Sequence, residues 1–207
     1  MKRLLHIIAT PRGRESRTLK ISRTFLDRVR SAYPDAAIDE LDLFQEELPP
    51  LTVTRVGGKY VLLGGGELTG AFKESWEQIE AHILRFLAAD AYLVSTPMWN
   101  FGISYRLKHY IDIIVQPRYL FQYTEEGPEG LVKNRSMVVI SSRGGDYSPD
   151  SPAHAYDQLE PYLRTVFGFV GIEDLTFVNA QPMDAAGDAV REQKIGEAID
   201  AVKRLRL

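Results

Sequence analysis

Three short stretches of this sequence carry residue types that are unusual for surface loops. The first is TPRGRESRT at 10–18, which mixes hydroxyl groups with arginines: Thr10, Ser16 and Thr18 with Arg12, Arg14 and Arg17. Where such a stretch opens a helix, free N–H groups and the positive end of the helix dipole attract anions, so it predicts a phosphate site. The competing interpretation is an ordinary helix cap, because Ser and Thr precede many helices.

The second stretch, TPMWNFGIS at 96–104, combines flat apolar side chains with an amide and a glycine. Its members are Pro97, Met98, Trp99, Asn100, Phe101 and Gly102. A planar heteroaromatic ligand needs this mixture of packing surface and a few donors at one edge. Gly102 would also let the backbone approach a ring closely. The competing interpretation is that Met98, Trp99 and Phe101 fold inward and belong to the core.

The third stretch, SSRGGDY at 141–147, contains a glycine pair. Ser142 and Arg143 precede Gly144 and Gly145, and Tyr147 follows them. Two glycines after a strand can expose successive N–H groups that hold an anion or a carbonyl oxygen. A plain turn explains this stretch equally well when it is taken alone.

Signatures of several other chemistries do not occur in the sequence. It has no cysteine, no Walker loop, no G-x-G-x-x-G, no H-E-x-x-H and no G-x-S-x-G. Thiolate catalysis, dinucleotide binding of the Rossmann type, zinc hydrolysis and serine hydrolysis therefore lack support. The four histidines share no spacing, so we expect no metal site. The acidic residues between 39 and 47 are most simply a solvated face.

The elements that must position these stretches alternate regularly along the chain. Apolar runs predict five strands at 4–9, 38–44, 91–96, 137–142 and 175–180. Amphipathic patterns predict helices at 16–34, 72–89, 102–115, 153–171 and 186–206. Such alternation predicts an α/β protein, a single domain over 1–207, whose parallel sheet has helices on both faces. The expected strand order is the flavodoxin-like 2-1-3-4-5, which puts all three stretches at the carboxyl ends of strands.

Two segments are longer than ordinary connections. Residues 45–70 are rich in Pro and Gly, and residues 116–134 separate the third helix from the fourth strand. Loops of this length in a small domain are usually functional or interfacial. We expect the glycines at 64–66 to form a flexible turn.

Charge and hydropathy narrow the possible partners and location. The formal net charge is -3, which argues against a nucleic-acid partner. The apolar stretch near the start is too short for a secretory signal, and no run reaches the roughly 20 apolar residues that span a bilayer. We expect no membrane partner and a cytoplasmic location.

Taken together, the motifs resemble the FMN-dependent NAD(P)H azoreductases, also described as NAD(P)H:quinone oxidoreductases, of the flavodoxin-like fold. The resemblance rests on PMWNFGIS, YTEEGPEGL, SRGG and FGFVGI in this order, together with the less specific first loop. It implies one bound FMN. Thr10, Ser16, Arg17 and Thr18 would then hold the phosphate, the 97–102 stretch would line the flavin ring, and Ser142, Arg143, Gly144 and Gly145 would close its other edge.

The resemblance also implies an activity and an assembly. NADH or NADPH would pass a hydride to the flavin, and a quinone or azo compound would then receive two electrons at the same site. No side-chain acid or base is obligatory in this ping-pong scheme, because the cofactor carries the difficult step. The family implies a homodimer with sites at the interface, to which Tyr110, Ile113 and Ile114 and the 116–134 segment would contribute.

Several points stay open at this stage. Phe121, Tyr123, Phe167 and Phe169 are candidates for the acceptor pocket, although burial in the subunit's own core explains Phe167 and Phe169 equally well. Arg55 and Lys59 could reach the 2′-phosphate of NADPH or simply face water. The alternative function is a non-enzymatic electron carrier of the flavodoxin type. Such carriers are usually strongly acidic, and the net charge of -3 disfavours this reading.

Overall fold

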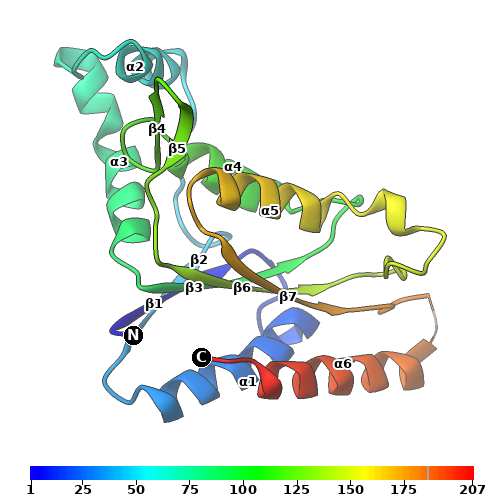
Figure 1. Ribbon diagram of the computed structural model, residues 1–207. Coiled ribbons are helices and arrows are strands. Elements are labelled where there is room, and N and C mark those ends of the chain that lie inside the picture. The colour runs from blue at the N-terminus through cyan, green and yellow to red at the C-terminus, as the bar shows by residue number, and fades with distance from the viewer. Residues whose placement is uncertain (186) are drawn as a thin grey trace.

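A five-stranded parallel sheet forms the centre of the protein. The computed structural model describes residues 1–185 and 187–207. Its main sheet has the order β2-β1-β3-β6-β7, with all neighbours parallel (Figure 1). The strands are β1 (Arg3–Ile8), β2 (Ala37–Asp42), β3 (Ala91–Pro97), β6 (Ser136–Ser142) and β7 (Asp174–Ala180). Counted along the main sheet, this is the predicted order 2-1-3-4-5, so the predicted fold class is confirmed.

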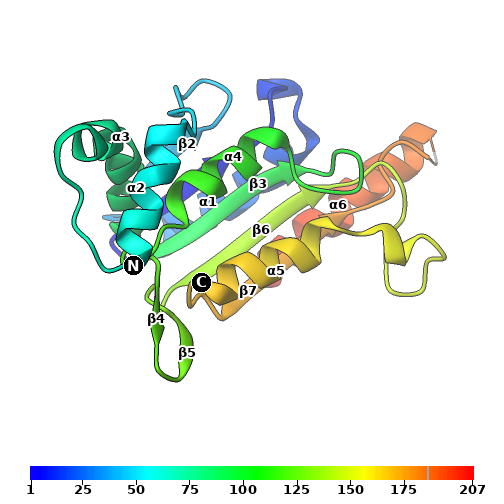
Figure 2. The same ribbon diagram turned by 90° about the horizontal axis from the view of Figure 1, so that it is seen from above.

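Helices cover both faces of this sheet (Figures 1 and 2). One face carries α1 (Arg17–Ala32) and α6 (Gly187–Arg204), and the other carries α3 (Gly70–Leu87), α4 (Tyr105–Ile114) and α5 (Leu159–Phe169). Side chains alternate along β1, so that Leu5 and Ile7 enter the core under α3 to α5 while Leu4 enters the core under α1 and α6. Because both faces are buried, the central strands are almost continuously apolar.

Capping residues set where the helices begin. Ser104 has an extended backbone and its side chain accepts a hydrogen bond from Leu107 N, so α4 begins at Tyr105 and not at 102 as expected. The carboxylate of Asp157 accepts from the amides of Leu159 and Glu160, and α5 therefore begins well after the predicted 153. Residue 186, at the start of the last predicted helix, lies outside the described residues.

The sequence had suggested that residues 45–70 form one long loop, and the structure shows that this is wrong. The segment contains α2 (Val53–Leu63), which packs on α3. Gly57 and Gly58 lower helix propensity and hide this helix in the sequence. In the structure a Cβ on Gly58 would lie 2.3 Å from Nε1 of Trp76, which donates a hydrogen bond to Arg55 O. The glycine thus permits close packing of α2 against α3.

The 116–134 segment contains a two-stranded antiparallel hairpin, β4 (Phe121–Thr124) and β5 (Gly127–Gly130). It lies near the amino ends of the central strands, beside the turn that joins α5 to β7 (Figure 1). A Cβ on Gly130 would lie 2.3 Å from both Gly171 N and Val170 C. Only a glycine allows this contact between two backbones.

We therefore expect Gly130→Ala to lower the free energy of unfolding by about 1–3 kcal/mol, the usual range for overpacking. The matched control is Gly168→Ala in α5, where an added Cβ meets no heavy atom within 4 Å. That change should stabilise the protein by about 0.5–1 kcal/mol, since alanine favours a helix. Urea denaturation of both variants measures the difference. An unchanged midpoint for Gly130→Ala would contradict the close backbone approach.

Candidate functional site

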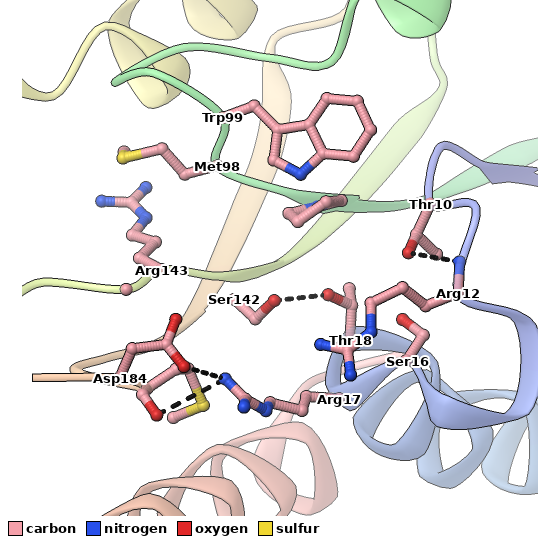
Figure 3. Close-up of a pocket in the computed structure, with 13 residues that line it drawn as sticks. Thr10, Arg12, Ser16, Arg17, Thr18, Met98, Trp99, Ser142, Arg143 and Asp184 are labelled. Atoms are coloured by element: carbon pink, nitrogen blue, oxygen red, sulfur yellow. Dashed lines mark hydrogen bonds and ion pairs between the residues drawn. The ribbon is translucent and has the colours of Figure 1, made fainter. Parts of the chain in front are cut away.

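The three unusual stretches meet at the carboxyl edge of the sheet. Strand order reverses between β1 and β3, and the loops that follow these strands, together with the loop after β6, surround an open cavity (Figure 3). Open α/β sheets bind ligands at such a position. The cavity is lined by Thr10, Arg12, Ser16, Arg17, Thr18, Pro97, Met98, Trp99, Ser142, Arg143, Gly144, Met183 and Asp184.

One end of the cavity offers hydroxyl groups and the N-terminus of a helix. Ser16 is the N-cap of α1 and its side chain accepts from Leu19 N at 3.3 Å. Thr10 and Thr18 are buried, and Thr18 Oγ1 lies 2.8 Å from Ser142 Oγ. Ser16 therefore does cap a helix, as the competing interpretation held. The same N-terminus also faces the cavity, where its dipole attracts an anion.

Two residues that sequence reasoning missed complete this end. Arg17 donates to a carboxylate oxygen of Asp184 at 2.6 Å and approaches Met183 O at 3.4 Å (Figure 3). Met183 and Asp184 follow β7, and their amides donate to Arg143 O at 2.8 Å and Gly144 O at 3.0 Å. No motif marks them in the sequence, because only this docking brings them to Arg17.

The aromatic stretch forms a tight turn at the opposite end. Trp99 and Gly102 exchange two backbone hydrogen bonds of 2.9 Å around Asn100 and Phe101, whose φ angles are +46° and +71°. Positive φ at both central residues is typical of a type I′ turn, where Asn fits and Phe is strained. Trp99 is 36% exposed and Phe101 48% exposed, whereas Met98 packs against the core. The inward-folding interpretation therefore holds only for Met98.

The third stretch behaves as the glycine pair suggested. Within the described part of the chain, the amides of Gly144 and Gly145 donate to no protein acceptor. Gly144 lines the cavity, whereas Gly145 lies just outside it, close to the Tyr147 ring. Two unengaged amides at a strand end can hold an anionic or carbonyl oxygen.

The side chain of Arg143 binds other protein side chains, whereas its place in the sequence had suggested that it contacts a ligand. Its guanidinium is 1% exposed and donates to Asp157 at 2.6 Å and to Ser141 Oγ at 3.1 Å. A second carboxylate, of Glu160, lies 3.7 Å away. Because a buried charge needs a partner, this ion pair ties the loop after β6 to the start of α5. The side chain lies on the Met98 side of the cavity, away from Ser16 and Arg17 (Figure 3).

The four acceptor candidates do not reach this cavity within one chain. Phe121, Tyr123 and Phe169 form one aromatic group at the hairpin, with Phe121 and Phe169 centroids 4.7 Å apart. This group lies near the amino ends of the strands, at the other end of the sheet (Figure 1). Phe167 is fully buried and stacks with Phe86, so its assignment to an acceptor pocket was wrong. It belongs to the subunit's own core.

A buried polar chain lies beneath the cavity. His6 Nε2 is 2.8 Å from Ser95 Oγ, which is 2.7 Å from Ser22 Oγ, and Ser22 donates to Thr18 O. Burial, together with the smaller effect of the positive charge of Arg30, lowers the pKa of His6 to about 4. The imidazole is therefore neutral at pH 7 and supports α1 without carrying charge.

Because His6 is buried in its neutral form, we expect the free energy of unfolding to fall in mild acid. In the unfolded chain, His6 takes up a proton near its ordinary pKa of 6.5, whereas the folded state resists protonation until about 4. The stabilisation is complete above 6.5 and disappears as the pH falls to 4, a loss of about 3 kcal/mol. Unfolding titrations of the protein and of His6→Gln between pH 7 and 4 measure it. The variant should lose less stability than the native chain over this range. If His6→Gln loses as much stability as the native chain, the buried neutral histidine is not the cause.

The fold and this crevice define an open α/β protein of the doubly wound class. A family model described as "Flavodoxin-like fold" matches residues 2–205. An FMN-dependent NADH:quinone oxidoreductase of Nitratidesulfovibrio vulgaris is 34% identical over all of this chain and 99% of its own length. One from Nostoc punctiforme is 38% identical over 98% of this chain and 97% of its own.

The fold of this chain is also similar to that of a solved structure. The FMN-dependent NADH-azoreductase of Bacillus anthracis, determined in complex with FMN, superposes with a TM-score of 0.85 at 30% identity and covers 99% of both chains. The chain therefore belongs to the flavodoxin-like family of FMN-dependent NADH:quinone oxidoreductases and azoreductases. This confirms the resemblance drawn from the motifs.

The described residues contain neither a metal cluster nor a membrane-spanning helix. No group of three or more histidines and carboxylates among residues 1–185 and 187–207 is placed to hold a metal ion. In the same part of the chain, no helix is long and apolar enough to cross a membrane.

Proposed function

We propose that the crevice binds FMN and that the protein uses NADH to reduce quinones and azo compounds. The observation that carries the proposal is the pairing of two complementary ends in one cavity. A helix N-terminus with buried hydroxyls and Arg17 suits a phosphate. At the other end, Pro97, Met98 and Trp99 line the cavity and the exposed Phe101 lies just outside it on the same strained turn, which suits a flat ring. The residues present therefore fit FMN.

Each part of the cofactor has a set of residues suited to hold it. The phosphate would lie among Thr10, Ser16, Arg17 and Thr18, at the N-terminus of α1. The ring would lie against the turn formed by Pro97, Met98, Trp99, Asn100, Phe101 and Gly102. On its other edge, Ser142 and the unengaged amides of Gly144 and Gly145 would face the ring oxygens, while Arg143 contributes its backbone.

The residues of this chain contribute position and electrostatics. When bound, FMN supplies two-electron transfer between a nicotinamide and an acceptor. The Arg17 guanidinium and the α1 dipole would balance the charge of the phosphate, and the 97–102 turn would provide the surface against which the ring packs. Because Trp99 and Phe101 face solvent, donor and acceptor would use the same open side in turn. No side chain at the cavity is assigned a proton-transfer role.

The structure bears on the choice of donor through Arg55. Its guanidinium donates to Ser75 O, Pro50 O and Gln78 Oε1, and thereby fixes α2 against α3. An arginine used in this way does not reach a 2′-phosphate. NADH is the donor printed in the names of the quinone oxidoreductase relatives, and we assign the same donor to this chain.

A direct assay distinguishes the proposed enzyme from the rival function, a non-enzymatic electron carrier of the flavodoxin type. The purified protein, loaded with FMN, should oxidise NADH rapidly when a quinone is added and no other protein is present. Absorbance at the flavin bands establishes loading, and the loss of NADH absorbance gives the rate. A loaded protein that takes no electrons from NADH is a carrier, and a protein that takes up no FMN refutes the whole proposal.

The proposal extends to a homodimer in the cytoplasm, built from a single domain over residues 1–207. The sequence had placed part of the dimer contact on Tyr110, Ile113 and Ile114, which was wrong because all three are fully buried in the subunit's own core. Four exposed apolar residues lie instead on one side of α2: Val53, Val56, Tyr60 and Leu63. This surface and the hairpin are the contacts that we propose for a second copy.

The phosphate assignment predicts a selective effect of Arg17→Ala. A hydrogen bond to a charged group contributes about 1.5–3 kcal/mol, so FMN binding should weaken about 10- to 100-fold. Riboflavin, which lacks the phosphate, should bind the variant and the native protein alike. Quenching of flavin fluorescence measures both affinities. The matched control is Arg14→Ala, an exposed arginine of the same loop that lies outside the cavity.

Two results would contradict the assignment. Equal loss of FMN and riboflavin affinity in Arg17→Ala would mean that the arginine supports the fold and not the phosphate. An equal loss of FMN affinity in Arg14→Ala would mean that general positive charge, and not this position, attracts the ligand.

A further inference from the structure

A second aromatic group flanks the crevice outside the cavity itself. The Phe101 ring lies 5.5 Å from the Tyr156 ring and 6.3 Å from the Tyr147 ring, measured between centroids. Tyr156 is 60% exposed and Phe101 is 48% exposed. Tyr147 and Tyr156 belong to the long connection between β6 and α5, and the sequence motifs gave Tyr156 no role.

This exposure is held in place by hydrogen bonds and is not a loose arrangement. Gln158 N donates to Phe101 O at 2.9 Å, which joins the connection directly to the strained turn. Immediately before it, the buried carboxylate of Asp157 binds Arg143 and caps α5. The buried ion pair therefore fixes the backbone that carries Tyr156. Exposed apolar side chains that lie next to one another mark binding surfaces, and the exposed rings of Phe101 and Tyr156 are such neighbours.

The connection is also braced on its other side. His154 Nδ1 lies 3.0 Å from Tyr147 O, and Ser151 donates to Asp146 O at 2.7 Å. Among the described residues, the hydroxyls of Tyr147 and Tyr156 make no hydrogen bond to protein. Both phenols are thus available to donate to a ligand oxygen.

We propose that Phe101, Tyr147 and Tyr156 form an acceptor platform, and that Tyr156 is the residue that selects fused-ring acceptors over compact ones. The inference rests on the proposed function and adds the acceptor's binding surface to it. Aromatic rings attract one another in tilted and offset arrangements, so a two-ring quinone can pack on the exposed ring of Tyr156. Carbonyl oxygens at its edge can accept from the free phenols. The proposal concerns acceptor binding and leaves the electron-transfer step unchanged.

The platform differs in place from the acceptor residues suggested by the sequence. Tyr123 and its neighbours lie at the hairpin, at the opposite end of the sheet. Tyr156, in contrast, belongs to the same end as the cavity, because its neighbour Phe101 follows Trp99 by two residues. Phe101, Tyr147 and Tyr156 therefore lie together beside the crevice within one chain.

The test compares Tyr156→Ala with the native FMN-loaded protein. Binding of 2-methyl-1,4-naphthoquinone to the oxidised protein, without NADH, is followed by the change in flavin absorbance. We expect the dissociation constant to rise about 3- to 10-fold, which is the size of one aromatic contact. In turnover with NADH, the ratio of kcat/KM for the naphthoquinone to kcat/KM for ferricyanide should fall by the same factor. Ferricyanide is a compact anion without a flat face.

Three further variants make the test specific. Tyr156→Phe keeps the ring and should retain most of the naphthoquinone affinity. Tyr105→Ala removes a tyrosine that is 66% exposed at the same edge of the sheet but contacts Phe44 and not Phe101. It should not change the ratio. Tyr123→Ala tests the hairpin as the rival acceptor surface.

The results show whether the acceptor platform fails while the proposed function stands. Unchanged naphthoquinone binding in Tyr156→Ala overturns the platform, and so does a loss in Tyr123→Ala with Tyr156→Ala unchanged. An equal loss with naphthoquinone and ferricyanide also overturns it, because Tyr156 would then act on the flavin or the fold. A native protein that takes up FMN and is reduced by NADH keeps the proposed function whatever these variants show.

Discussion

The reversal of strand order between β1 and β3 is the constraint on which the rest of the structure depends. From that point the chain crosses to opposite faces of the sheet, so α1 and α4 diverge and leave a crevice at the carboxyl edge. The sheet can hold this edge rigidly because both its faces are buried. The candidate site is built from the carboxyl ends of β3 and β6, the loops after β1, β3, β6 and β7, and the N-terminus of α1.

The two ends of the crevice differ in their physical character: one concentrates positive charge and the other contains a strained backbone turn. At the phosphate end, hydroxyls and Arg17 lie at a helix N-terminus, and in the structure Asp184 partly neutralises that charge. At the ring end, Phe101 keeps a positive φ that disfavours any residue with a Cβ. Such strain persists only where surrounding contacts determine the backbone. Here the paired hydrogen bonds of Trp99 with Gly102 and the bond from Gln158 to Phe101 O do so.

Buried charge organises the outer part of the site. The Arg143–Asp157 pair is almost fully enclosed, so removing either partner would leave an uncompensated charge. The pair therefore links the glycine loop after β6 to the start of α5, and with it the segment that presents Tyr156. Two groups of exposed apolar residues stand out. Trp99, Phe101 and Tyr156 lie at the carboxyl edge, whereas Val53, Val56, Tyr60 and Leu63 lie on α2.

The fold class, the strand order and the three loops that line the candidate site follow from the sequence alone. Strands buried on both faces are continuously apolar, and cap residues and motif spacing are local properties that can be read from the chain. Tertiary structure decided what depends on distant partners. It placed Met183 and Asp184 beside Arg17, turned Arg143 towards Asp157 and buried Phe167. It also packed α2 on α3, where Gly57 and Gly58 make room for Phe72 and Trp76. No local pattern contains these pairings, since each forms only when the sheet brings separate loops together.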